Sequence, residues 1–344
     1  MKSRWTIRKK LLVLMLLTLA PFAVVGAVWS GWLLSEEQER VRSFTLDLAR
    51  FAALEVDDVV NQAEALLTGL AEAPPIRRLD TKGSDALLSR LLPRYPSYEN
   101  IIAVDTKGRM YGTGLLDPWK KKAFLGDRAW FQAAMRSDSL IVGDPIYGRV
   151  KGKPVVMLAY PVKDDSGRRV GTVSVALGLL LIQKVLAEVP IPGDGIITVF
   201  NPDGRVLART ADPEEWVLKD LSQTELFKGI APLGSGFFEG TGLDGVRRVM
   251  AFVRPKRPPW IVMVTIPSSH AYTRFWQSFW AQALSILGAL SLAVLLAGLF
   301  GRGLIRSFAR LTERARAVAG GRLERGGVPE GAEREVAELF ESFD

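Results

Sequence analysis

One short segment, DRAWF at residues 127–131, combines a carboxylate, a guanidinium and two large aromatic rings. A planar guanidinium between aromatic walls can hold a carboxylate ligand through two parallel hydrogen bonds. The segment also suits an ordinary helix start, with Asp127 as N-cap and Arg128 as a solvated residue of the first turn. Arg128 and Trp130 are two residues apart and so do not share one helical face. The residues alone favour the solvated arginine, since most charged side chains lie at the surface.

The rest of the sequence offers little for acid–base, thiol or metal chemistry. The chain has no cysteine, which excludes disulfides, thiol catalysis and cysteine-type zinc sites. Its single histidine, His270, cannot by itself form a Ser-His-Asp set or an HExxH metal site. GTGLDG at 240–245 matches GxGxxG, but a strand-like run follows where a phosphate site needs a helix, so we expect a hairpin turn. We therefore expect no catalytic domain and no cofactor in these 344 residues.

Two uncharged runs, residues 11–34 and 275–301, are long enough as helices to cross the ~30 Å hydrocarbon core of a bilayer. A cleaved signal peptide is the alternative for the first run, but that run exceeds a normal signal-peptide core and lacks a small-x-small cleavage site. Residues 1–10 carry five basic side chains and no acid, whereas the acidic SEEQER follows the first run. The positive-inside rule then places both termini in the cytoplasm and residues 35–274 outside. The formal charge of +8 is mostly this topology signal and does not indicate a nucleic-acid surface.

A long helix is predicted after the first run. It should end at Pro74-Pro75, because proline cannot continue the hydrogen-bond ladder. One face of this helix is expected to pack against the outer domain. Its apolar residues recur at spacings of three and four, at Val41, Phe44, Leu48, Ala52, Val56, Val59, Ala63, Leu66 and Leu70.

Two copies of one strand–turn–strand pattern follow, IIAVDTKGRMYGTG at 101–114 and ITVFNPDGRVLART at 197–210. Each copy places Asp or Asn, two further residues and Gly-Arg between apolar strands, which suits an Asx turn with glycine at positive φ. A further hairpin of apolar strands comes after each copy. The repeat predicts two related α/β modules with antiparallel sheets, a distal module at 40–190 and a proximal module at 191–270.

These segments together resemble a known bacterial receptor architecture. DRAWF, GDPIYGRVKGKPVVMLAYPV, DDSGRRVG, FNPDGRVL and PPWIVMVTIP are similar to double Cache (dCache) sensor domains over residues 40–270. This resemblance implies PAS-like antiparallel sheets on a long N-terminal helix. Residues 302–344, with a 4-3-4-3 apolar seam, GGRL and REVAELFESFD, resemble a HAMP signalling relay. Ser307 and Arg334 depart from that family, which usually has proline and an acid at these positions.

The resemblance implies a ligand pocket in the distal module, lined by the helix at DRAWF, the next loop and the neighbouring strands. In the amino-acid-binding branch of these sensors an aspartate holds the ligand's ammonium group, and Ala176 stands at that position here. A buried ammonium without a carboxylate is costly, so we expect an organic acid as ligand. A purely structural distal module is the alternative. By position in the family motif, the candidate ligand-binding residues are Arg128, Trp130, Phe131, Asp144, Tyr147 and Tyr160.

We interpret the chain as the input half of a bacterial inner-membrane receptor with two spans. The seam of the HAMP-like segment needs partner helices, so a parallel homodimer is expected. The chain ends within a second amphipathic helix, which suggests a continuation beyond Asp344. The output stays open between a histidine kinase, a diguanylate cyclase and a chemoreceptor, with a stand-alone membrane-anchored binding protein as a further class. Transport is disfavoured, because the spans carry no charge.

Overall fold

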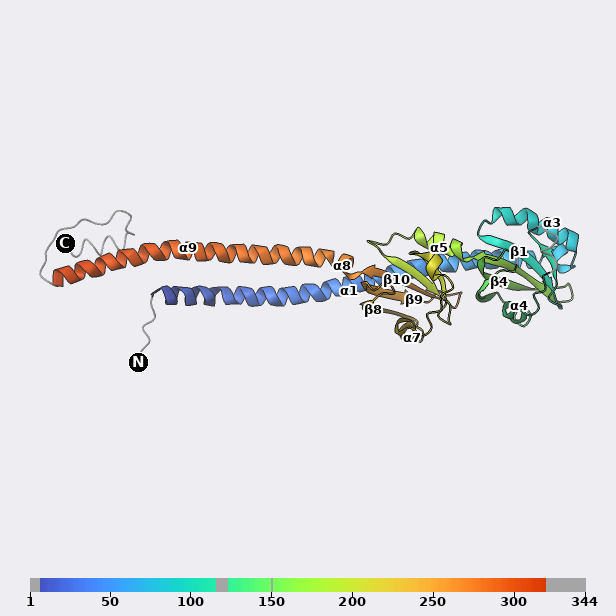
Figure 1. The fold of residues 1–344 in the computed structure, drawn as a ribbon, viewed down its shortest axis with the longest axis horizontal. Coiled ribbons are helices and arrows are strands. Elements are labelled where there is room, and N and C mark those ends of the chain that lie inside the picture. Colours follow the sequence, from blue (N-terminus) through green and yellow to red (C-terminus); the bar gives the residue numbers. More distant parts are fainter. Residues whose placement is uncertain (1–6, 116–122, 150, 320–344) are drawn as a thin grey trace. The chain divides into compact units, whose positions relative to one another are not determined.

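The computed structural model describes residues 7–115, 123–149 and 151–319. One compact unit comprises Gln38–Thr273, and the two ends of the chain form a second unit. Two long helices, α1 (Ile7–Ala71) and α9 (Thr273–Ala319), precede and follow ten strands in the sequence (Figure 1). The shorter helices are α2 (Pro74–Arg77), α3 (Thr81–Leu91), the 3-10 turn η1 (Leu92–Arg94), α4 (Ala129–Ala134), α5 (Leu179–Ala187), α6 (Pro213–Trp216), α7 (Glu225–Ile230) and α8 (Ser268–Ala271).

The strands form two five-stranded antiparallel sheets with the same topology, so the predicted pair of related modules is confirmed. The strand orders are β2-β1-β5-β4-β3 and β7-β6-β10-β9-β8. The distal sheet contains β1 (Tyr98–Asp105), β2 (Met110–Thr113), β3 (Ile141–Tyr147), β4 (Pro154–Lys163) and β5 (Arg169–Gly178). The proximal sheet contains β6 (Ile196–Phe200), β7 (Val206–Arg209), β8 (Ser235–Thr241), β9 (Arg247–Val253) and β10 (Ile261–Pro267).

The two copies also share strand register. Ile102 pairs with Thr113 in the distal sheet, and Thr198 pairs with Arg209 in the proximal one. Each pair of strands shifts register two residues further on, before Val104 and before Phe200. A residue of one module therefore has a structural equivalent in the other, 96 positions along the chain for the segment from β1 to β2.

The predicted Asx turns are present in both modules. The Asp105 carboxylate accepts hydrogen bonds from the backbone N–H groups of Lys107 and Arg109, both at 2.9 Å. Asn201 accepts one from the backbone N–H of Arg205 at 2.8 Å. Gly108 and Gly204 have φ angles of +77° and +86°, which residues other than glycine rarely adopt. The two turns are therefore encoded locally, by four-residue patterns that can be read from the sequence.

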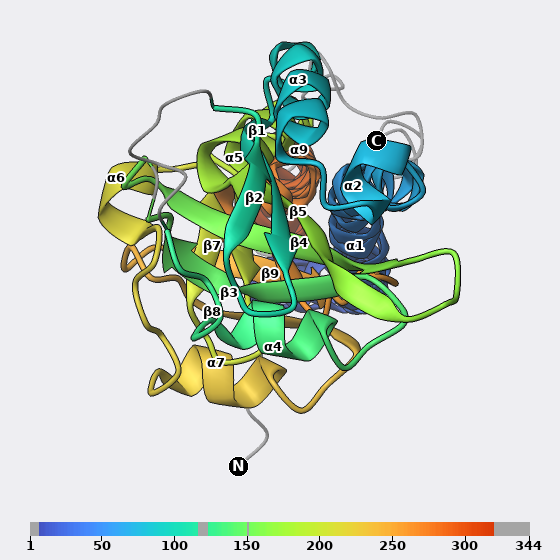
Figure 2. The ribbon, with the colours of Figure 1, turned by 90° about the vertical axis from the view of Figure 1, so that its right-hand side faces the viewer.

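The distal sheet has a helical layer on each face. Figure 2 shows α1, α2 and α3 on one side of this sheet and α4 on the other. Along β4, Val156, Leu158 and Val162 belong to the apolar cluster that contains α1, whereas Val155 and Met157 belong to the cluster under α4. Because strand side chains alternate between faces, the sequence of β4 supplies both cores at once.

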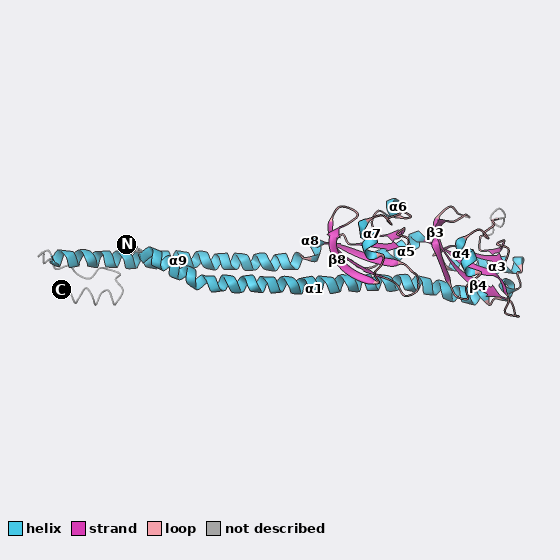
Figure 3. Cartoon of the chain, turned by 90° about the horizontal axis from the view of Figure 1, so that it is seen from below, coloured by secondary structure: helices cyan, strands magenta, loops and turns pink. Residues whose placement is uncertain are grey.

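The C-terminal half of α1 packs along both sheets (Figure 3), through one apolar cluster that includes residues of both modules. The predicted stripe is confirmed at every position except Phe44, whose side chain is 47% exposed. Ala49 and Ala53, which the stripe did not include, are also buried, because small residues let the helix backbone approach the sheets closely. Val41, Ala52, Val56, Ala63 and Leu70 are buried in the cluster, and Leu48, Val59 and Leu66 are partly buried against it.

Within α9, the stretch Phe275–Leu296 is long and apolar enough to cross a membrane, with a mean hydropathy of 2.0. In the described residues no second helix meets the same criterion, so the first of the two expected spans remains a prediction. The expected HAMP segment falls largely outside the described residues, at 320–344, and its first part continues helix α9.

Candidate ligand-binding site

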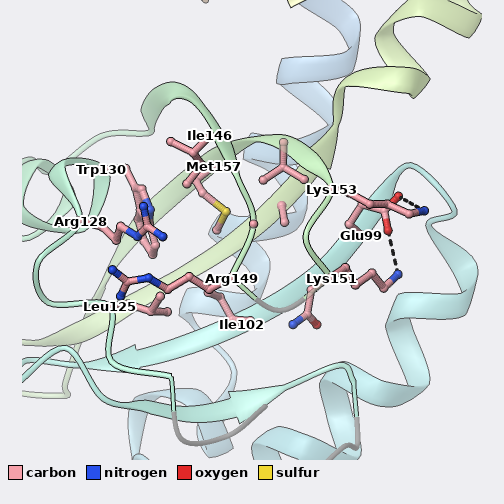
Figure 4. Close-up of a pocket in the computed structure, with 14 residues that line it drawn as sticks. Glu99, Ile102, Leu125, Arg128, Trp130, Ile146, Arg149, Lys151, Lys153 and Met157 are labelled. Atoms are coloured by element: carbon pink, nitrogen blue, oxygen red, sulfur yellow. Dashed lines mark hydrogen bonds and ion pairs between the residues drawn. The ribbon is translucent and has the colours of Figure 1, made fainter. Parts of the chain in front are cut away.

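A pocket of about 50 Å³ lies on the face of the distal sheet opposite α1 (Figure 4). This volume is several times the ~10–15 Å³ that one water molecule requires, so the hollow suits a small ligand. Its apolar lining comes from strands β1, β3, β4 and β5, from α4 and from the turn before it, through Ile102, Leu125, Trp130, Ile146, Val155, Met157 and Ala176. Its charged lining consists of Glu99, Arg128, Arg149, Lys151 and Lys153.

Arg128 is the residue that precedes the first turn of α4. Its backbone is extended, with φ −81° and ψ 130°, and its side chain makes no capping hydrogen bond. The expectation that Asp127 caps this helix is wrong, because Arg128 holds the N-cap position. Since Arg128 lies before the helical residues, the two-residue spacing does not keep it and Trp130 apart, and both line the pocket.

Asp127 instead binds a second arginine of the pocket. The Arg149 guanidinium donates to both carboxylate oxygens of Asp127, with Nη1–Oδ1 at 3.0 Å. These hydrogen bonds from Arg149 hold the pKa of the Asp127 carboxyl below its usual range. The pair ties the loop after β3 to the start of α4, and it orients Arg149 along the rim of the pocket.

Two hydrogen-bond donors of the pocket have no acceptor. The guanidinium of Arg128 makes no hydrogen bond or ion pair with any residue in the described ranges. The indole Nε1 of Trp130 is buried and has no partner either, as far as the structure describes the chain. Trp130 is only 5% exposed and packs edge-on against Phe131. A buried donor without an acceptor costs free energy, so such groups need a specific explanation.

The other end of the pocket holds a cluster of opposite charges (Figure 4). Lys151 and Lys153 donate to the two carboxylate oxygens of Glu99, at 2.8 Å and 3.1 Å. Burial raises the pKa of Glu99, but the two ammonium groups outweigh burial, so the pKa lies below its ordinary value. Among the described lining residues four cations thus face one carboxylate, which makes the hollow electropositive.

The remaining sequence candidates lie elsewhere. Phe131 belongs to the apolar cluster beneath α4 and is not among the described lining residues. Asp144 is exposed and accepts a hydrogen bond from Asn201 of the proximal module at 3.5 Å. Tyr147 is 65% exposed, because its neighbour Ile146 takes the inward position on β3.

Tyr160 lies on the face of the distal sheet that does not carry the pocket. Strand alternation was expected to turn it toward the ligand, but the even-numbered residues of β4 face α1. Tyr160 packs against that cluster, on the opposite face of the sheet from Met157. The expectation that Tyr160 lies on the pocket face of β4 is therefore wrong, because a shift of one position along a strand changes the face.

Sequence reasoning missed Glu99, Arg149, Lys151 and Lys153. Three of them had a signal, since the glycine-containing segment GRVKGK places cations at alternate residues. Glu99 had none, because its partners are more than fifty residues away in the chain. Ala176 is on the pocket wall, which is where its alignment with the family motif placed it.

Two antiparallel sheets of one topology on a single helix, with a pocket on the distal sheet, define a two-module α/β domain. Residues 32–275 match the sequence profile of the dCache_1 family, described as a Cache domain, and the chain belongs to this family. Cache domains are extracellular sensor domains.

Solved structures with the same fold come from two kinds of receptor. The ligand-binding domain of the Pseudomonas aeruginosa PAO1 amino acid chemoreceptor PctB, in complex with L-Arg, is 21% identical. Its TM-score is 0.57, over 68% of this chain and 98% of that one. The extracellular domain of a candidate histidine kinase, rpHK1S-Z16, is 20% identical with a TM-score of 0.51, over 69% and 97% of the two chains.

A curated relative is Sporulation kinase D of Bacillus subtilis (strain 168), which is 26% identical over 174 residues. This match covers 51% of the chain but only 33% of the kinase, so the chain spans about a third of that relative. The chain thus carries a Cache sensor domain that resembles those of chemoreceptors and histidine kinases.

Proposed function

We propose that the chain is the sensing part of a transmembrane receptor whose distal module binds a small organic acid. The observation that carries this proposal is that, among the described residues, neither the Arg128 guanidinium nor the indole N–H of Trp130 has a partner, and both groups are at the pocket. A planar carboxylate satisfies both donors at once, through a two-pronged pairing with arginine and a hydrogen bond from the indole.

The charge balance of the pocket supports an anion over a cation. Glu99 is occupied by Lys151 and Lys153, and Asp127 is occupied by Arg149. Arg128 is the cation left for a ligand, and its electrostatic effect is strengthened by the apolar wall around it. Aromatic and aliphatic side chains on that wall suit the short carbon chain of an organic acid.

An α-amino acid is the second candidate ligand. PctB was solved with L-Arg, and Glu99 lines the present pocket, so an ammonium group could replace one of the two lysines there. Ala176 argues against this candidate, because it leaves the wall of β5 without a carboxylate. The two ligand classes therefore differ in one contact. An organic acid leaves the ion pairs of Glu99 with Lys151 and Lys153 intact, whereas an amino acid breaks one of them.

For the relay, we infer that the stretch Phe275–Leu296 spans the membrane and that a HAMP segment at 302–344 follows it in a parallel homodimer. β10 leads through α8 directly into α9, so a change in the proximal sheet has a short path to this span. The Asp57 carboxylate supports such a path, since it binds the backbone N–H groups of Lys256 and Arg257, both at 2.9 Å, and so holds the β9–β10 turn on α1. A histidine kinase, a diguanylate cyclase and a chemoreceptor remain alternative outputs.

Isothermal titration of the whole chain in nanodiscs tests the ligand proposal. The panel contains acetate, succinate and pyruvate as organic acids, and serine, valine and arginine as amino acids. An organic acid should bind, and Arg128→Ala should weaken it by roughly tenfold or more, because a charged hydrogen-bonded pair contributes about 1.5–3 kcal/mol. Arg136→Ala is the matched control, since Arg136 is exposed just after α4 and lies off the pocket.

Three results would contradict parts of this proposal. Equal binding in Arg128→Ala and the parent would remove Arg128 from the site. A preference for amino acids would establish the second candidate. For the relay, single cysteines along Phe275–Leu296 can be crosslinked directly, because the chain has no cysteine of its own. Crosslinking rates that do not change with ligand would contradict transmission through this helix.

A further inference from the structure

The proximal module contains a buried arginine, Arg209, that forms no ion pair with any residue the structure describes. Arg209, at the end of β7, is only 4% exposed. Its Nη1 donates to the hydroxyl of Thr198 at 3.0 Å, and its Nε is buried without a partner. Within residues 7–115, 123–149 and 151–319, Arg209 forms no ion pair, and its Nη2 makes no hydrogen bond. The edge formed by Nε and Nη2 is the side of a guanidinium that pairs with a planar carboxylate.

A second buried arginine increases the positive charge there. Arg248 on β9 is also 4% exposed, and its Nη2 binds the Asp244 carboxylate at 2.7 Å. Arg248 repels Arg209, whereas Asp244 attracts both. Exposed Asp212 and Glu215 also attract Arg209, but from solvent, and Glu215 is paired with Lys219. Two buried guanidinium groups therefore share one close carboxylate, which leaves a net positive charge.

This arrangement is costly unless an anion completes it. Burial lowers the pKa of Arg209, since removing a guanidinium from water disfavours its charged form. A buried charge without a hydrogen-bonded counter-charge is rare in folded proteins. The hydroxyl of Thr198 and the ring of Trp216, 4.9 Å from the guanidinium carbon, compensate only part of that cost.

The segment that covers Arg209 is strained at both ends. Trp216 is the last residue of α6, and positive φ angles occur at Asp212, directly before this short helix, and at Leu218, two residues after it. Asp212 has φ +47° and Leu218 has φ +69°. Aspartate tolerates this conformation, but for leucine it is a true outlier, and such strain concentrates at ligand clamps and switches. A segment with strained ends that covers a buried charge is suited to move.

The cluster also occupies the face that carries the pocket in the distal module. By strand pairing, Arg248 is equivalent to Val155, which lines the distal pocket. Thr265 is likewise equivalent to Ala176 on the pocket wall. Arg209 is equivalent to Thr113, on the neighbouring edge strand. The proximal module thus places two arginines around the position where the distal module has its hollow.

We propose that the proximal module holds a second anion site, in which the Nε–Nη2 edge of Arg209 binds a small carboxylate when the Trp216 segment moves aside. The Thr198 hydroxyl holds Nη1 and so positions that edge, and Arg248 adds positive charge beside it. This site is independent of the distal ligand, because none of its residues lines the distal pocket.

Acetate titration of the whole chain in nanodiscs tests this site, with Trp216 fluorescence as the signal and sodium chloride as the ionic-strength control. All variants carry Arg128→Ala, which weakens acetate binding at the distal site. A further variant with Trp216→Phe identifies the part of the fluorescence change that comes from Trp216. A saturable acetate response should remain in this background. Arg209→Gln should weaken it by roughly tenfold or more, because the charged partner is lost. No response in the Arg128→Ala background, or an equal response with Arg209→Gln, would overturn the proposal.

Asp244→Asn provides a variant with the opposite expected sign. It removes the one close carboxylate, so acetate affinity should rise several-fold if the cluster binds anions. A cluster with only a structural role would give unchanged or weaker binding, and that result would overturn the proposal. If Arg209→Gln fails to fold, as judged by its unfolding curve, Asp244→Asn alone decides. Binding of the organic acid by the distal pocket, measured with Arg128 intact, reports separately on the function proposed above.

Discussion

The two modules share strand order, strand register and turns, yet they differ at the residue that begins the helix over the sheet. In the proximal module Thr224 holds this position, and its hydroxyl accepts a hydrogen bond from the backbone N–H of Phe227. In the distal module the equivalent residue is Arg128, which caps nothing. Threonine is a good N-cap and arginine is not. A local folding rule is thus kept in one copy and broken in the other, at the pocket.

The modules also place their cations differently. The distal cations lie before α4 and in the loop between β3 and β4, where side chains reach the pocket from outside the sheet. The proximal cations Arg209 and Arg248 lie on strands, within the core face. The sheet is needed for folding in both copies, whereas the positions around it can change. The distal cations thus lie on segments that can vary without changing the sheet, whereas the proximal cations are part of the sheet itself.

The equivalent aromatic residues Phe131 and Phe227 test whether the cores are equal. Both are 5% exposed under their helices. Replacing either with alanine should lower the free energy of unfolding by about 3–5 kcal/mol, because the loss of a buried phenyl ring leaves a cavity. Urea unfolding followed by circular dichroism measures both variants. A much smaller loss of unfolding free energy for Phe131→Ala would mean that the distal core is less tightly packed around its pocket than the proximal core.

Alanine substitutions at the turn glycines test how tightly each turn packs against the neighbouring chain. A Cβ at Gly108 would lie 2.3 Å from the Cα of Gly126, and a Cβ at Gly204 would lie 2.8 Å from the Cα of Ser222. Gly167 has the same φ of +77° as Gly108, but a Cβ there meets nothing within 4 Å. Gly167→Ala should therefore cost about 1–2 kcal/mol from backbone strain alone.

Gly108→Ala and Gly204→Ala should each cost roughly a further 1–3 kcal/mol, because backbone must shift to admit the methyl group. Thermal unfolding of the three variants separates strain from steric clash. Equal losses of stability in all three variants would show that the neighbouring backbone shifts at little cost. The two turns would then be held less tightly than their geometry indicates.

These turns could be predicted from the sequence, because the Asx residue, the glycine and their hydrogen bonds lie within five residues. The two sheets could be predicted for the same reason, from the repeated hairpins. The pocket could be predicted only in part. Arg128 and Trp130 were found through the family motif, whereas Tyr160 was placed on the wrong face, since alternation alone does not say which face a strand turns to the ligand. Glu99 and Lys151 are 52 residues apart in the sequence and meet only in the folded sheet, so no local pattern predicts their pairing.

Exchanging the two helix-start residues sharpens the contrast between folding and recognition. Arg128→Thr should raise the free energy of unfolding by about 1 kcal/mol, because threonine caps α4, while organic-acid binding is lost. Thr224→Arg should lower it by about as much. Unfolding curves and calorimetric titration of the two variants measure both effects. A destabilised Arg128→Thr would show that Arg128 supports α4 after all.

The smallest expected effect concerns Glu99. Its pKa is lowered in the folded chain, so its ion pairs stabilise the fold above the ordinary carboxyl pKa of 4.5, and this contribution is lost as the pH falls through the lowered value. Glu99→Gln should therefore reduce stability by less than about 1 kcal/mol at neutral pH and flatten the acid side of the stability curve. It should also free Lys151 and Lys153, so anion affinity should rise several-fold. Glu72→Gln is the control, since its exposed pair with Arg77 lies outside the pocket and away from Arg209. If an amino acid binds better to the parent than to Glu99→Gln, Glu99 holds an ammonium group, and the distal module differs from the proximal one by a carboxylate contact as well as by Arg128.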